Sequence, residues 1–224
     1  MSAILSTILK NVSIWIYMAP VLLISFPVHE SAHAYSAYRL GDDTAKRAGR
    51  LTLNPFKHLD LLGTICLVLF QFGWAKPVPV DPRNFRNPRA GMAATAIAGP
   101  FSNLILAFVS ILLLHLFGTA AAYTMPVWLA TILATFLMYL AIVNINLCLF
   151  NLIPVPPLDG SNILQFFLPR AAQEFFDRNA RYFQFLILLL FFFPELTAPL
   201  QAMTQNIYRN LNAIAGALFG LFAR

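Results

Sequence analysis

Residues 14–38 read IWIYMAPVLLISFPVHESAHAYSAY, an apolar run that ends in the pattern His-Glu-x-x-His. Its length suits a helix that crosses a membrane. Residues four apart lie on the same face of an α-helix, so the imidazoles of His29 and His33 can bind one metal ion. Ionisable side chains within an apolar helix are costly in lipid and indicate a functional site by default. The run therefore predicts a membrane helix that carries a metal site.

Glu30 follows the first histidine and would stand beside the metal without binding it. A zinc ion held by such a pair can lower the pKa of water to about 7, and a neighbouring carboxylate can take the proton as the water attacks a carbonyl. The pattern thus favours hydrolysis, with Glu30 as general base. The competing interpretation is that the three side chains form only the polar end of a membrane helix, satisfied by water and backbone.

Composition sets the class of protein. Of the 224 residues, 59% are hydrophobic and only 11% are charged, which is far from the balance of a soluble domain. We expect one membrane-embedded domain over residues 1–224, because no long polar stretch is available for a second. The formal charge of +6 would suggest nucleic acid in a soluble chain, but here it relates to membrane orientation, and no nucleic-acid partner is expected.

The order of apolar and polar stretches predicts an all-α polytopic membrane protein with four or more transmembrane helices. The apolar run 61–73 is too short to span as an upright helix and is predicted to be re-entrant. Short membrane-associated β-strands are expected as well. The spans are expected at about 11–38, 91–117, 126–152 and 182–193, and the strands at 50–54 and 76–82. Whether residues 195–224 span the membrane or lie in the interface stays open.

Basic residues indicate the orientation of the chain. Three loops hold twelve of the fifteen Lys and Arg residues, at Arg39–Lys57, Lys76–Arg89 and Arg170–Arg181. The positive-inside rule places these loops in the cytosol. We therefore expect a multi-pass protein of the cell membrane whose histidine pair faces the cytosolic side.

Asp159 follows the third span on that same side and is the candidate for a third metal ligand. A catalytic zinc site has three protein ligands and one open position. Besides Glu30, Asp159 is the only carboxylate that the layout places within the membrane. The alternative is that Asp159 caps a helix beside Gly160, a common use of aspartate.

Three motifs resemble those of a known protein family: HESAH at 29–33, GPFSN at 99–103 and NLIPVPPLDG at 151–160. Over residues 20–168 the chain resembles the site-2 protease family of intramembrane zinc metalloproteases, in its short prokaryotic form without PDZ or CBS domains. The resemblance implies cleavage of peptide bonds within transmembrane segments of membrane proteins. It implies one zinc ion per chain on His29, His33 and Asp159. It also implies that Asn151 lies near the site, as a donor to the oxyanion or to the substrate backbone.

Two loop features complete the candidate site. Residues 76–82 alternate small apolar residues with prolines, which is typical of an unpaired edge, so Val78 and Val80 are predicted to pair with an unwound substrate. His58 could reach the site, although a structural loop histidine is the simpler interpretation.

Two other functions compete with this one. A membrane protease of a different His-Glu-x-x-His class takes a later glutamate as third ligand. The only later glutamates are Glu174 and Glu195, and neither sits in an apolar helix with a supporting carboxylate. A small transporter or metal-handling protein could use the ionisable cluster for ion passage. The absence of basic residues within the spans makes an anionic solute a poor fit.

Overall fold

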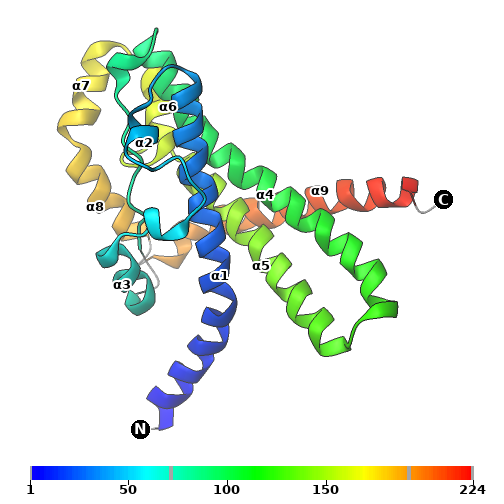
Figure 1. Cartoon of the computed structure of the whole chain (residues 1–224). Coiled ribbons are helices and arrows are strands. Elements are labelled where there is room, and N and C mark those ends of the chain that lie inside the picture. The colour runs from blue at the N-terminus through cyan, green and yellow to red at the C-terminus, as the bar shows by residue number, and fades with distance from the viewer. Residues whose placement is uncertain (1, 71–72, 191–192, 223–224) are drawn as a thin grey trace.

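The computed structural model describes residues 2–70, 73–190 and 193–222, and helices account for all the regular structure of these residues (Figure 1). The helices, in chain order, are α1 (Ser2–Arg39), α2 (Thr44–Arg47), α3 (Leu61–Phe70), α4 (Pro88–Thr124), α5 (Val127–Asn151), α6 (Asp159–Phe167), α7 (Arg170–Arg178), α8 (Ala180–Leu190) and α9 (Pro194–Phe222). Two short 3-10 turns, η1 (Pro55–Lys57) and η2 (Pro82–Asn84), lie in the loops between α2 and α4.

Two of the described helices are long and apolar enough to cross a membrane, at Pro88–Gly118 in α4 and at Val127–Asn151 in α5. The prediction of four or more transmembrane helices was therefore wrong by this measure. The first helix, α1, is less apolar than α4 and α5, because its second half carries the ionisable cluster. The described part of α8 has eleven residues and is about 16 Å long.

The prediction of short β-strands was also wrong for the described residues. Around 50–54, the carbonyl of Thr52 accepts hydrogen bonds from the side chains of Ser31 and His58. It is therefore used by side chains and not by a neighbouring strand. Around 76–82, the prolines have no N–H to donate to a ladder. What forms there is a single isolated antiparallel bridge between Leu59 and Ala75.

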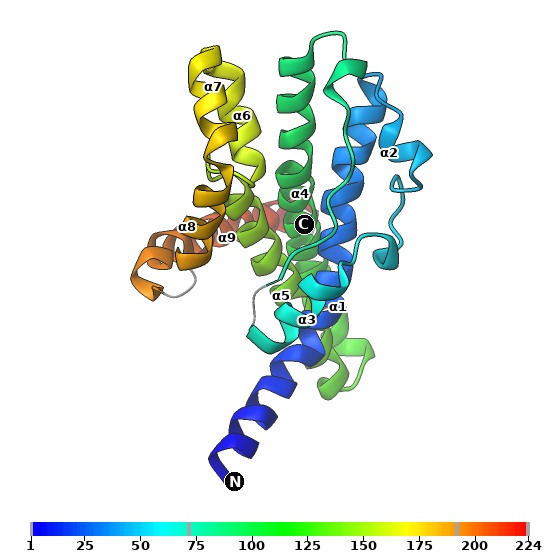
Figure 2. The same ribbon diagram turned by 90° about the vertical axis from the view of Figure 1, so that its left-hand side faces the viewer.

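The centre of the molecule is the packing of α4 against α1 on one side and α5 on the other (Figures 1 and 2). Helix α4 runs back antiparallel to α1, as Figure 2 shows. Both helices bury small residues, which allow helix backbones to approach closely. The buried alanines are Ala34 and Ala37 on α1 and Ala93, Ala96 and Ala107 on α4.

The last helix, α9, lies across α4 and α5 and does not run alongside them (Figure 1). A small core forms where the three helices meet, at Ile111, Ala141 and Ala215. His115 on α4 contacts the Asn212 side chain at 3.0 Å and stacks on the Phe219 ring. This far end of α4 is thus held by α9.

Asp42 connects the loop after α1 with the segment that precedes α4. Its buried carboxylate accepts hydrogen bonds from the Thr44 N–H and hydroxyl, from the Asp81 N–H and from the Asn84 side chain. Burial raises the pKa of this carboxyl, but the hydrogen bonds outweigh burial and lower the pKa below its ordinary value. The carboxylate therefore stays charged and fixes residues 81–84 at the end of α1.

Candidate metal centre

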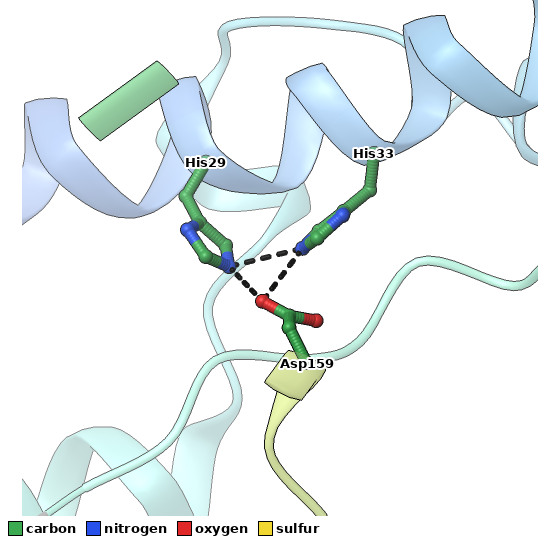
Figure 3. A group of neighbouring side chains, drawn as sticks. All are labelled: His29, His33 and Asp159. Carbon is green, nitrogen blue, oxygen red and sulfur yellow. Dashed lines mark hydrogen bonds and ion pairs between the residues drawn. The ribbon is translucent and has the colours of Figure 1, made fainter. Parts of the chain in front are cut away.

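Two helices bring three metal-ligand side chains together (Figure 3). His29 and His33 lie one turn apart on α1, and Asp159 is the first residue of α6. His29 Nε2 lies 3.0 Å from His33 Nε2, and Asp159 Oδ2 lies 3.2 Å from the first and 3.3 Å from the second. Both histidines are at least nine-tenths buried. Among the described residues, these three form the one group with metal-ligand spacing.

The spacing of the three atoms suits zinc. Zinc binds histidine nitrogen and carboxylate oxygen at about 2.0–2.2 Å, and tetrahedral geometry then separates any two ligand atoms by roughly 3.3 Å. The observed separations of 3.0, 3.2 and 3.3 Å are close to that value. Three protein donors also leave a fourth position for water or substrate, as in catalytic zinc sites.

Helix α4 orients the second histidine. His33 Nδ1 lies 2.7 Å from the Thr95 carbonyl oxygen. A carbonyl can only accept, so Nδ1 carries the proton and Nε2 turns its lone pair toward Asp159. Gly99, one turn further along α4, makes room for both rings. A Cβ atom there would lie 2.4 Å from His33 Nε2 and 2.7 Å from His29 Cε1.

Asp159 does not serve as a helix cap. The N-cap of α6 is Leu158, which has no capping side chain, and the Asp159 carboxylate faces the histidines instead. Gly160 sets this position, because a Cβ atom there would lie 2.3 Å from the Leu152 carbonyl oxygen. The start of α6 can therefore press against the end of α5, which brings Asp159 to α1.

Glu30 lies outside the group of three ligands, next to it on α1. Its Oε2 accepts a hydrogen bond from the Val78 N–H at 3.1 Å. Val78 stands between Pro77 and Pro79, neither of which has an N–H, so it supplies the donor of this stretch. The segment predicted to pair with substrate thus makes a contact with the predicted general base.

The other predicted site residues lie around this centre. His58 is buried, and its Nε2 lies 2.7 Å from the Thr52 carbonyl oxygen, so it holds the loop and is not among the three clustered ligands. Asn151 ends α5 and donates from its side chain to the Leu147 carbonyl at 2.9 Å. Val80 is half-buried, two residues beyond the contact with Glu30.

Sequence reasoning missed two residues of α4 that shape the site, Thr95 and Gly99. Thr95 acts through its backbone carbonyl, which every residue has, so no sequence signal marks it. Gly99 lies in the GPFSN motif, and its position in a row of small residues indicated a close helix contact without saying which side chains it would meet.

Comparison with known proteins identifies the family of this chain. The sequence model described as "Peptidase family M50" matches residues 17–193, which include all three clustered ligands. The chain belongs to peptidase family M50. Members of this family are membrane metalloproteases, in agreement with the two apolar helices of the structure.

Several relatives of this M50 chain have names that include the words zinc metalloprotease. YwhC of Bacillus subtilis, named as a candidate zinc metalloprotease, is 46% identical over 180 residues, which cover 80% of this chain and 81% of the relative. The Rip2 proteins of Mycolicibacterium smegmatis and Mycobacterium tuberculosis are named in the same way. They are 28% and 29% identical, over 70% and 78% of this chain and 59% and 66% of their own length. No solved structure matches the chain with significance.

Asp159→Asn tests whether Asp159 binds the metal in this M50 protein. If Asp159 binds zinc, the change replaces an anionic ligand with a neutral one in a poorly solvated site, and zinc affinity should fall about 10-fold or more. If Asp159 served only the start of α6, the change would be tolerated, because Asn and Asp rank together at helix starts. Competition with a chelator measures the affinity. Parental affinity together with full cleavage would refute ligation.

Proposed function

We propose that this chain is a zinc-dependent intramembrane endopeptidase that hydrolyses peptide bonds within the transmembrane segments of other membrane proteins. The observation that carries the proposal is the convergence of His29, His33 and Asp159 beside a glutamate, in a member of a membrane peptidase family. The relatives' names support zinc as the metal. One ion per chain fits the single group of ligands found in the described part of the chain.

Each residue of the centre has a defined task in this reaction. Zinc bound by the three ligands would supply Lewis acidity, which would make water acidic enough to lose a proton near neutral pH. Glu30 accepts that proton as water attacks the peptide carbonyl, and returns it to the leaving nitrogen when the peptide bond breaks. The Val78 N–H holds the Glu30 carboxylate in place for this exchange.

Substrate would approach along the proline-rich segment. A peptide bond in a helix has its carbonyl in a hydrogen bond, so the target must unwind before attack. An extended target can add to an exposed backbone edge. Because the Val78 N–H is engaged by Glu30, we assign the substrate contact chiefly to Val80, with Asn151 as a further donor at the end of α5.

The cleavage itself is tested with purified protein in liposomes and a model substrate that has one transmembrane helix. We expect cuts inside the apolar segment, mapped by mass spectrometry. They should stop when a chelator removes the metal and resume when zinc is returned. The chelated sample is the control for contaminating proteases that need no metal. Cuts confined to the aqueous flanks, or cuts that survive chelation, would contradict the proposal.

The orientation is proposed from the basic loops. Asn84 donates to Asp42, which ties the loop after α1 to the one before α4, so the exposed Lys46 and Arg86 should face one compartment, the cytosol. Single cysteines at these two positions, in a chain without Cys66 and Cys148, can be probed with an impermeant thiol reagent. Both should react only after the cells are permeabilised. Labelling of either position in intact cells would contradict this orientation.

A further inference from the structure

The two metal-ligand histidines differ in the hydrogen-bond partner of their second ring nitrogen, Nδ1. His33 Nδ1 has the Thr95 carbonyl as its partner, whereas His29 Nδ1 is buried and has no hydrogen-bond partner among the described residues. A histidine that binds zinc through Nε2 carries a proton on Nδ1, and almost every such histidine donates it to an oxygen atom. His29 therefore needs an acceptor that its backbone surroundings do not provide.

The backbone carbonyl that is placed to accept a hydrogen bond from His29 already accepts others. His33 bonds to the Thr95 carbonyl of α4. Because α4 runs antiparallel to α1, the carbonyl in the matching position for His29 is that of Gly99, one turn further along α4. The Ser102 hydroxyl donates to the Gly99 carbonyl at 2.7 Å, in addition to the N–H that the helix itself supplies. A carbonyl oxygen has two lone pairs, so this one has no place left for His29.

Asn103 lies one further turn along α4, on the face that carries Thr95 and Gly99. Its side chain is fully buried, and both its amide oxygen and its amide nitrogen lack partners among the described residues. Leaving a polar group buried and unpaired costs about 1–3 kcal/mol, so such a group usually has a task. The ring of His29 turns Nδ1 away from His33, toward the preceding turn of α1 (Figure 3). Because α4 runs antiparallel to α1, the turn of α4 that follows Gly99 and carries Asn103 lies toward that same end of α1.

We propose that Asn103 is a positioning residue for the metal centre: its amide oxygen accepts the hydrogen bond from His29 Nδ1–H across one buried water. The contact would fix the tautomer of His29 and point its Nε2 at the metal. Asn144 on α5 supports this arrangement, because it donates to Ser25 at 2.8 Å and its own buried oxygen has no partner in the described chain. A bridging water would therefore have several polar neighbours, as buried waters require.

The proposal rests on the zinc site proposed above and is tested by zinc affinity, without any substrate. Asn103→Leu removes the acceptor at similar size, and Asn103→Asp keeps an acceptor and strengthens it. Ser110→Ala is the matched control, since Ser110 is also buried on α4 but its hydroxyl donates to the Leu106 carbonyl of its own helix. Each protein is stripped of metal, checked by thermal unfolding and titrated with zinc against a chelator.

We expect Asn103→Leu to weaken zinc binding about 10- to 100-fold, the usual effect of losing a partner of a ligand. Asn103→Asp should bind zinc as tightly as the parent or tighter, and Ser110→Ala should match the parent. A Leu variant within about twofold of the parent, or an Asp variant weaker than the parent by tenfold, would overturn the proposal; the Asp result alone decides if the Leu variant does not fold. A parent chain that binds no zinc would instead refute the metal site itself.

Discussion

Glu30→Gln is expected to lower the rate of cleavage about 10²- to 10⁴-fold, the range that a general base contributes, while zinc content and fold stay unchanged. Glutamine has the shape of glutamate, and its side-chain oxygen can still accept the Val78 N–H. What it cannot do is take a proton from attacking water. Because Glu30 lies outside the group of ligands, its loss should not weaken metal binding.

Three measurements decide this prediction: zinc per chain, thermal unfolding and the rate of cleavage of a transmembrane substrate. Glu174→Gln is the matched control, because it makes the same chemical change at an exposed position on α7. Near-parental cleavage by Glu30→Gln would remove the general-base role. Joint loss of zinc and activity would mean that Glu30 belongs to the metal site itself.

Gly99→Ala should reduce zinc affinity about 100-fold or more, although the residue has no functional group. The added Cβ would lie 2.4 Å from His33 Nε2 and 2.5 Å from its Cε1, far inside contact distance. Either the imidazoles turn away from Asp159, or α4 moves back from α1 and takes the Thr95 carbonyl with it. Both responses separate the ligand atoms, and overpacking of this kind also costs about 1–3 kcal/mol of stability.

Gly118→Ala is the control for helix propensity, since it makes the same substitution on α4, where an added Cβ meets nothing within 4 Å. Zinc titration and thermal unfolding are compared for the two variants. A Gly99→Ala protein that binds zinc like the parent would show that the two helices can separate without disturbing the ligands. Loss of zinc in the Gly118→Ala protein as well would assign the effect to the backbone of α4.

The site was more predictable from sequence than the layout around it. His29 and His33 are linked by the pitch of one helix, so their proximity follows from their spacing alone. Asp159 is 126 residues beyond His33, and only an argument from membrane sidedness brought it near. The structure adds the reason that it arrives there: Gly160 lets α6 start against the end of α5.

The predicted strands failed because alternation of apolar residues does not reveal what the backbone groups bind. The Thr52 carbonyl accepts hydrogen bonds from the side chains of Ser31 and His58, which are 21 and six residues away in sequence. The Lys76 N–H does pair with the His58 carbonyl, but prolines follow and the pairing ends. Partners this distant cannot be identified from a single chain, and the same is true of the Asp42 contacts with Asp81 and Asn84.

The alternating prolines have a consequence for insertions and deletions in this chain. The segment is attached at two points, where the Val78 N–H meets Glu30 and where the Asp81 N–H meets Asp42. A shift of one residue in either direction would bring Pro77 or Pro79 to Glu30, and neither has a proton to offer. The stretch from 78 to 81 thus behaves as a spacer of fixed length. Changes in loop length are tolerable only outside it.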